Sequence, residues 1–285
     1  MKGSFSMERK ATTIVFGCGK GGVGKTTSCV CMSHILSKHG RNVLIIDTDH
    51  QGNASKEYGY FEDVTSEQSL SSYLSNFCQS PRKDQRPHAK DYIRGTEFEN
   101  INIITGDPRL QSDELLSAIT SLEVKMSINP FIILIQQIKS LGIYDFIMVD
   151  THPSMDVIVT STFQAADWIL VPTTVTDNSL DGATNTAYFI DDLRDAGRDV
   201  KLAGVFFTMV NNRTELSRVN MAAAKETRFK ECKVFESVIS QAEDIKKAEN
   251  MMRPASAAYP SCKAVKQYED LTREVVFAIG EARSI

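Results

Sequence analysis

Two lysines stand five residues apart in one glycine-rich stretch, and this arrangement points to phosphate chemistry. The stretch reads Gly17-Cys18-Gly19-Lys20-Gly21-Gly22-Val23-Gly24-Lys25-Thr26-Thr27. Gly19, four residues and then Gly24-Lys25-Thr26 match G-x-x-x-x-G-K-[ST], a loop whose backbone N–H groups cradle phosphates while its lysine reaches them. Glycines let such a loop bend tightly enough to aim these N–H groups inward. A nucleoside triphosphate is therefore the expected ligand, and Lys20 is a charge that an ordinary loop of this kind lacks.

The segments on either side of this loop predict a strand and a helix, the setting that a phosphate loop requires. Residues 11–16 are a short β-branched and aromatic run, and residues 26–39 carry apolar side chains at helical spacing. The loop therefore leads into a helix N-terminus, whose partial positive charge adds to that of the lysine. Thr26 is expected to hold Mg²⁺. The alternative is a glycine-rich turn without a ligand. The predicted nucleotide-binding residues in this stretch are Gly19, Lys20, Gly21, Gly22, Val23, Gly24, Lys25, Thr26 and Thr27.

Three aspartates follow predicted strands and supply the oxygens that a magnesium nucleotide needs. Residues 42–46 are a buried strand that leads to Asp47 and Asp49, and residues 143–149 are another that ends on Asp150. Ligands of open parallel sheets bind beyond the carboxyl ends of the strands, and Mg²⁺ prefers hard oxygen ligands. We expect both strands to flank the loop strand, so that the acids share a Mg²⁺ and water site with Asp150 on the metal side. For a single aspartate, the alternative is a turn or a helix cap.

Strands and helices alternate along the chain, which predicts an α/β fold of the P-loop NTPase type. A mostly parallel central sheet should be flanked by helices on both faces, with the loop strand near its centre. With 285 residues and 42% hydrophobic content, the chain can bury one large core. We expect a flexible leader over residues 1–10 and a single domain over residues 11–285. A surface loop is predicted over residues 76–100, where breaker residues gather.

Membrane and metal signals are weak in this sequence. No run approaches the roughly 18 apolar residues needed to cross a bilayer, and the N-terminus lacks the apolar region of a signal peptide. A cytoplasmic protein without a membrane partner is therefore expected. The six cysteines include no C-x-x-C pair, so reduced, packed thiols are favoured over a metal site or an iron–sulfur cluster.

Three stretches resemble the ParA/Soj partition ATPases, which belong to the deviant Walker A class. They are Lys20-Gly-Gly-Val-Gly-Lys25-Thr-Thr, Val43-Leu-Ile-Ile-Asp-Thr-Asp49-His-Gln-Gly-Asn53 and Tyr144-Asp-Phe-Ile-Met-Val-Asp-Thr-His-Pro-Ser154. The likeness continues through weaker stretches as far as Tyr268, so it covers nearly the whole chain. The loop with its first lysine is the most specific part.

The resemblance implies a role for each residue of the predicted site. Lys25 would bind the β and γ phosphates, and Lys20 would reach the nucleotide of a second subunit, so that ATP lies inside a homodimer. Asp49 would orient or activate the attacking water. Asp47 would support Mg²⁺ through water, and Asp150 would be the Walker B acid. A site that only a partner subunit completes should hydrolyse ATP slowly, which suits a switch.

The resemblance also implies partners for a short form without an N-terminal helix-turn-helix domain. The ATP-bound dimer would bind nucleoid DNA without sequence preference, and a centromere-binding, ParB-like protein would stimulate hydrolysis. Because the chain has 32 Lys and Arg against 36 Asp and Glu, a net charge of −4, any DNA site must be a local patch. Residues 213–253 are the best region, although a solvated helical face is the alternative. The candidate contacts are Arg218, Lys225, Arg228, Lys246, Lys247 and Arg253.

Asn211 is a candidate adenine contact because it follows a predicted strand over residues 202–209, and an amide can pair with the edge of the base. Turn-forming asparagines are the alternative.

The chain departs from the family pattern at His50, His152 and Ser240, where proline is usual. For the two histidines, a tolerated loop substitution is favoured over pH sensing. Ser240 bears on the pocket for the base.

Two other functions are consistent with the same loop. A MinD-like positioning ATPase would bind membranes through a C-terminal amphipathic helix. Here Leu271, Val275, Val276 and Ile279 share one side of such a helix, but its polar face is mostly acidic, so packing on the sheet is favoured. A nucleotide-binding module without hydrolysis would bind ATP and release no phosphate.

Overall fold

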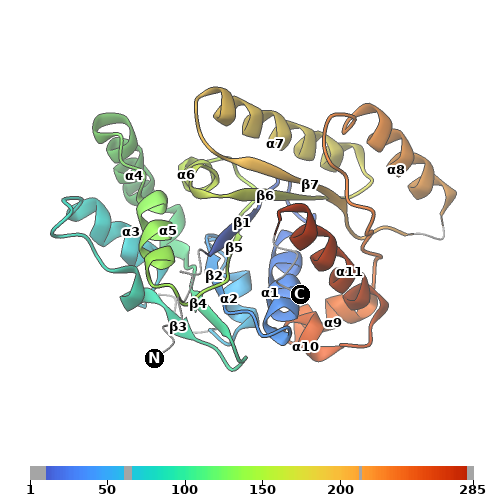
Figure 1. The fold of residues 1–285 in the computed structure, drawn as a ribbon, viewed down its shortest axis with the longest axis horizontal. Helices are drawn as coiled ribbons and strands as arrows, with labels where there is room; N and C mark the ends of the chain where they lie inside the picture. The colour runs from blue at the N-terminus through green and yellow to red at the C-terminus, as the bar shows by residue number, and fades with distance from the viewer. Residues whose placement is uncertain (1–10, 61–65, 212–213, 281–285) are drawn as a thin grey trace, which may run out of the picture.

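Seven strands form one sheet in the computed structural model, which describes residues 11–60, 66–211 and 214–280 (Figure 1). Their order is β3-β4-β2-β5-β1-β6-β7, and all neighbours are parallel except β3 and β4 at one edge. This confirms the predicted fold class. The strands are β1 Thr12–Phe16, β2 Val43–Asp47, β3 Arg94–Gly95, β4 Ile101–Ile104, β5 Phe146–Asp150, β6 Trp168–Thr173 and β7 Lys201–Phe207.

Helices cover both faces of this sheet, as predicted. The α-helices are α1 Lys25–Lys38, α2 Asn53–Glu57, α3 Leu70–Gln79, α4 Asp113–Met126, α5 Pro130–Ser140, α6 Val157–Ala165, α7 Asp177–Asp195, α8 Glu215–Thr227, α9 Glu243–Asn250, α10 Ala255–Ala258 and α11 Lys263–Ala278. Successive strand residues point to opposite faces. Val15 and Ile147 accordingly join one buried cluster with helices α3 to α7, and Ile14 and Met148 join another with α1, α2, α10 and α11.

Strand β5 lies between β1 and β2, so the expectation that both acidic strands flank the loop strand is correct only for β5. The register nevertheless aligns the three strand ends, because Phe16 and Asp47 both pair with Asp150. β1 is an interior strand with β5 on one side and β6 on the other. The acids and the loop therefore meet at one edge of the sheet, although β2 is one strand further away than predicted.

Residues 76–100 are only partly a loop. They hold the end of α3, a 3₁₀ helix η1 (Ala89–Tyr92) and the edge strand β3; a second 3₁₀ helix, η2 (Pro108–Gln111), comes later in the chain. Phe77 is fully buried, and the amide of Asn76 donates a hydrogen bond of 2.8 Å to the hydroxyl of Tyr92. These contacts order a segment whose proline, glycine and charged residues suggested a loop.

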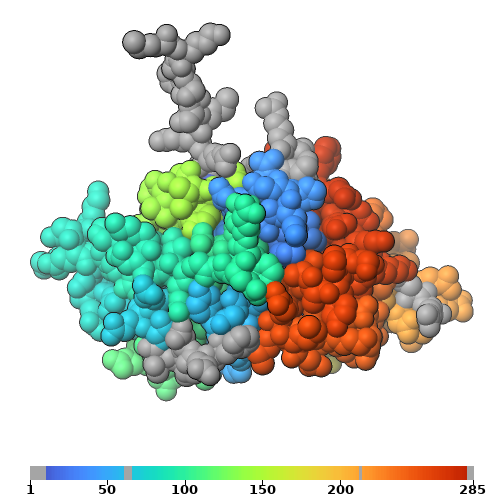
Figure 2. Space-filling view, turned by 90° about the horizontal axis from the view of Figure 1, so that it is seen from below, coloured from blue at the N-terminus to red at the C-terminus, as the bar shows by residue number. Residues whose placement is uncertain are grey.

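The C-terminal residues pack on the N-terminal half of the chain. Figure 2 shows the orange and red segment lying against the blue and teal residues, and the Arg253–Glu97 ion pair of 3.0 Å crosses this boundary. Leu271, Val275 and Val276 of α11 are buried, and α11 packs against α1. Within the described ranges, no single helix is long and apolar enough to cross a membrane; only α4 and α5 together, bent by 88°, reach that length and composition.

Candidate functional site

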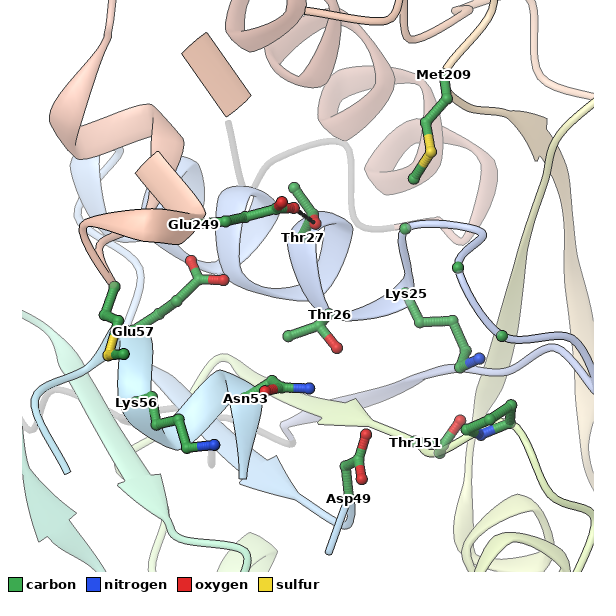
Figure 3. Close-up of a pocket in the computed structure, with 15 residues that line it drawn as sticks. Lys25, Thr26, Thr27, Asp49, Asn53, Lys56, Glu57, Thr151, Met209 and Glu249 are labelled. Carbon is green, nitrogen blue, oxygen red and sulfur yellow. Dashed lines mark hydrogen bonds between the residues drawn. The ribbon is translucent and has the colours of Figure 1, made fainter. Parts of the chain in front are cut away.

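The glycine-rich loop lies between β1 and α1 and borders a cavity of about 580 Å³ (Figure 3). Gly22 and Gly24 take left-handed backbone conformations, with φ of 73° and 82°, which glycine adopts without strain. Six loop residues line the cavity, whereas Gly19, Lys20 and Val23 do not. The residues that line it are Gly21, Gly22, Gly24, Lys25, Thr26 and Thr27.

The two lysines of the loop occupy different environments. Lys25 is buried, and its Nζ donates hydrogen bonds to the carbonyl oxygens of Lys20 (3.0 Å) and Cys18 (3.2 Å). Burial lowers the pKa of Lys25, and the negative charge of nearby acids opposes this shift. Lys20 is exposed and lies outside the cavity lining. Of the two lysines of the loop, Lys25 therefore faces the cavity of its own subunit and Lys20 does not.

Asp150 ends β5 beneath the loop and is fully buried. Neither of its carboxylate oxygens has a hydrogen-bond partner among the described residues. Burial raises the pKa of Asp150 well above its usual range, and the nearby Asp47 raises it further, while the Thr26 hydroxyl, which is close but forms no hydrogen bond of normal geometry, opposes this shift. A buried carboxylate without partners is costly. This orphaned pair of oxygens fits a hard cation such as Mg²⁺, with Thr26 available as a second oxygen ligand.

Asp47 is fully buried and does not line the cavity. Its Oδ2 accepts hydrogen bonds from the backbone N–H (2.8 Å) and the hydroxyl (2.6 Å) of Ser55, and its Oδ1 accepts one from the N–H of Asp49 (3.1 Å). Burial raises the pKa of Asp47 to about 6, and the Ser55 hydrogen bonds oppose this shift. The carboxylate therefore fixes the turn between β2 and α2, which is the role given above as the alternative for a single aspartate.

Asp49 lines the cavity, and its carboxylate points toward Thr26 (Figure 3). Its Oδ1 accepts a hydrogen bond of 2.9 Å from the N–H of Gln51. Gly106, which follows β4, packs directly on this segment: a Cβ there would lie 2.6 Å from the carbonyl oxygen of Asp49 and 2.8 Å from that of Asp47. Only glycine fits this contact. Sequence reasoning missed Gly106 because its partners are distant along the chain.

His50 and His152, two of the three departures from proline, lie together beside Asp49. Their ring centroids are 5.9 Å apart, and His50 Nδ1 is 3.6 Å from Asp49 Oδ1. The Nε2 of His152 pairs with Asp156 Oδ2 at 2.8 Å, and Asp156 also caps α6. Burial lowers the pKa of His152, but the hydrogen bond and charge of Asp156 have the larger effect, so the pKa of His152 is raised overall. Burial raises the pKa of Asp156, but the hydrogen bonds that this carboxylate accepts have the larger effect, so its pKa is lowered overall.

These two shifts predict pH-dependent stability from the His152–Asp156 pair. A histidine whose pKa is raised in the folded protein stabilises the fold at pH values below its pKa in the unfolded chain, which is about 6.5. This stabilisation is lost as the pH rises through the pKa of the folded protein. A lowered aspartate pKa stabilises it above the unfolded value of about 3.9. His152→Gln should therefore lower Tm by about 2 °C more at pH 5.5 than at pH 8.5. Thermal melts at both pH values, with the exposed His39→Gln as control, check this; equal losses at the two pH values would contradict it.

The far end of the cavity is acidic, which the sequence did not suggest. Glu249 of α9 accepts a hydrogen bond of 2.8 Å from the hydroxyl of Thr27, drawn as a dashed line in Figure 3. Glu57 of α2 lines the cavity beside it. Burial raises the pKa of Glu57 well above its usual range, and the charge of Glu249 adds to the shift. The first turn of α1 thus contacts a carboxylate from the C-terminal part of the chain.

An apolar cavity of about 150 Å³ adjoins the first and shares Gly24, Thr27, Met209 and Glu249 with it. Its further lining residues include Ile239, Ala242, Ile245 and Tyr268.

Of the two residues expected near the base, one lines this cavity and the other does not. Ser240 lines it, and its N–H, which proline would lack, donates a hydrogen bond of 2.8 Å to Gln267 Oε1. Asn211 lines neither cavity and is exposed after β7. The structure therefore does not bring the expected adenine contact to the cavity.

The six candidate DNA contacts are divided between α8 with its C-terminal end and α9 with the segment that follows it. Helices α8 and α9 lie apart, with α11 between them in Figure 1. Four of the candidates form ion pairs: Lys225 with Glu236, Arg228 with Asp181, Lys247 with Asp244, and Arg253 with Glu97. Within the described ranges, Arg218 on α8 and Lys246 on α9 form no ion pair and are exposed. Arg213, at the start of the candidate region, lies outside the described residues.

The chain is similar in sequence to a known protein family and to partition proteins from other organisms. The model of a family described as AAA domain matches residues 11–202. The chromosome-partitioning ATPase Soj of Treponema pallidum is 26% identical over 94% of this chain and 98% of its own length. The chromosome partitioning protein ParA of Caulobacter vibrioides is 27% identical over 90% of this chain and 91% of its own length.

Two solved structures share the fold. A variant of McdA from Cyanothece, in complex with ATP, has a TM-score of 0.75 and 22% identity, over 95% of this chain and 97% of that one. The septum site-determining protein MinD of Pyrococcus horikoshii, complexed with Mg-ADP, has a TM-score of 0.70 and 24% identity, over 93% and 96%. At these identities the likeness concerns the fold.

Proposed function

The chain belongs to the AAA domain family, and we propose that this member is a ParA-like partition ATPase that works as an ATP-bound homodimer. One observation carries the proposal: Lys25 is buried at the cavity, whereas Lys20 of the same loop is exposed and outside the cavity lining. A cation that does not serve its own cavity suits a phosphate held by a second copy. Similarity to Soj and ParA over nine-tenths or more of the chain supports this function.

Within one subunit, ATP would lie with its phosphates on the glycine-rich loop and its base in the adjoining apolar cavity. Thr26 and Asp150 would hold Mg²⁺, because both Asp150 oxygens are buried without partners among the described residues. The bound ion would neutralise charge on the phosphate oxygens. The folds of the McdA–ATP and MinD–Mg-ADP complexes support this choice of ligands.

Three side chains divide the work of hydrolysis. Lys25 binds the β and γ phosphates of its own subunit, and Asp49, on the cavity wall, orients the water that attacks the γ phosphorus. Lys20 of the second copy stabilises the charge that develops as the bond to ADP breaks. Each subunit therefore completes the site of the other, so hydrolysis is slow and depends on the dimer.

The ATP-bound dimer would bind DNA through phosphate contacts without sequence preference and act on the nucleoid, with a ParB-like partner stimulating hydrolysis. The exposed Arg218 and Lys246 are the candidates best placed to contact DNA, because they form no ion pair within the described ranges. Dimerisation doubles any such patch, and several weak phosphate contacts then act together.

Sedimentation with random-sequence DNA, and in parallel with anionic liposomes, tests this function. The ATP form should sediment with DNA at 50 mM salt, and its affinity for DNA should fall at least about tenfold at 200 mM salt. It should not sediment with the liposomes. Arg218→Ala should weaken DNA binding, whereas Lys247→Ala, whose side chain pairs with Asp244, should have little effect. Lys246 is left unchanged in this test because it also lines the cavity proposed for the base. Equal DNA binding by the ATP and ADP forms, or sedimentation with liposomes alone, would overturn the partition function.

A further inference from the structure

We infer that two residues of helix α7, Gly182 and Thr186, form a contact surface for the loop, called the seat below, and that this seat positions Lys20. Gly182 lies inside α7, where glycine weakens a helix. A Cβ at Gly182 would lie 2.8 Å from Lys20 Cβ and 3.5 Å from Lys20 N. The loop thus rests against the bare backbone of the helix, and any larger residue would push Lys20 away.

Thr186, one turn further along α7, holds the same part of the loop by a hydrogen bond. The backbone N–H of Gly19 donates to Thr186 Oγ1 at 3.1 Å, and this hydroxyl donates in turn to the carbonyl oxygen of Gly182 at 2.7 Å. Thr186 is buried, with 2% of its surface exposed. The N–H of Gly19 therefore fixes the loop to the helix and is not available to a phosphate.

Lys25 makes a second contact with this part of the loop, because its Nζ donates a hydrogen bond to the carbonyl oxygen of Lys20. The backbone of Lys20 is thus held both by α7 and by a lysine that faces the cavity, while Lys20 itself remains exposed. A clamped backbone narrows the directions that an exposed side chain can take, which lowers the entropy lost when it contacts a ligand. Gly182 and Thr186 are positioning residues, because they act through Lys20.

This inference rests on the proposed function, in which Lys20 reaches a nucleotide held by a second copy. The seat would then set the affinity of the ATP-dependent dimer more than the affinity of one subunit for nucleotide. Removing the seat should weaken dimerisation while leaving the N–H groups of residues 21–25 and the Lys25 ammonium to bind phosphate.

Thr186→Val keeps the shape of the side chain and removes the hydrogen bond, and Gly182→Ala adds the clashing Cβ. By sedimentation velocity in ATP, each should raise the Kd of the dimer about tenfold, which is the effect of about 1.4 kcal/mol. Affinity of the monomer for ADP, from calorimetry, should change less than about twofold. Thr186→Ser keeps the hydroxyl and should therefore dimerise like the natural chain.

Thr184→Val is the matched control, because Thr184 makes the same kind of bond within α7, to the carbonyl oxygen of Leu180 at 2.9 Å, whereas only the Thr186 hydroxyl also accepts the N–H of Gly19. Lys20→Ala is the reference. If Lys20→Ala prevents dimerisation but Thr186→Val and Gly182→Ala dimerise like the natural chain, the seat is refuted and the proposed function stands. If Lys20→Ala also dimerises normally, both the seat and the proposed function are contradicted.

Discussion

Lys20→Ala should abolish ATP-dependent dimerisation of the variant with itself and lower dimer-dependent ATP hydrolysis by about 10³-fold, the lower end of what a trans-acting cation supplies in other phosphoryl-transfer sites. The physical reason is charge: a cation about 4 Å from a phosphate oxygen is worth roughly 4 kcal/mol at an effective dielectric near 20. ADP binding should survive, because Lys25 and the loop N–H groups are unchanged. Phosphate release and sedimentation velocity in ATP measure the two losses.

Lys38→Ala is the control for this variant, because Lys38 is an exposed lysine at the far end of α1. It should dimerise and hydrolyse ATP as the natural chain does. Hydrolysis by Lys20→Ala at the natural rate would show that the exposed lysine has no part in the reaction.

Asp49→Ala should trap the ATP-bound dimer, lowering hydrolysis by about 10² to 10⁴-fold, which is the range for a group that activates water. Asp49 borders the cavity without belonging to the loop, so the phosphate-binding groups and Lys20 stay in place. Size-exclusion chromatography with light scattering should therefore find a dimer that persists in ATP for much longer than the natural one.

Asp49→Asn separates catalysis from structure. Its amide oxygen can still accept the hydrogen bond that Gln51 donates to Asp49 Oδ1, so the turn should be preserved. This variant should also form a long-lived dimer and hydrolyse ATP slowly, because the charge that activates water is gone. Natural turnover by Asp49→Asn would remove Asp49 from the mechanism.

The parts of the site that could be predicted from the sequence are those set by local chain geometry. A glycine-rich turn between a strand and a helix places Gly24, Lys25 and Thr26 without help from distant residues. Asp150 could be predicted for a related reason, because an apolar strand that ends on an acid delivers it to the ligand edge of a parallel sheet. The apolar face of α11 was likewise visible in its 3.6-residue spacing.

The parts that could not be predicted depend on contacts between segments far apart in the chain. Gly106 and Gly182 matter because a backbone passes where their Cβ would be, and no local pattern records that approach. Glu249 reaches Thr27 only through the docking of α9 beside α1. The order of the strands was also beyond the sequence, since nothing in β2 or β5 says which of them pairs with β1.

Mixing Lys20→Ala with Asp49→Ala tests most directly whether one subunit is half of the active site. In a mixed dimer, the Lys20→Ala subunit keeps Asp49 at its own cavity and receives Lys20 from the Asp49→Ala subunit, so one site is complete. Phosphate release should therefore rise well above the sum of the two variants measured alone, to as much as half the natural rate if every dimer is mixed. If Lys20 serves its own subunit instead, neither site is complete, and a rate no higher than that sum would contradict the shared site.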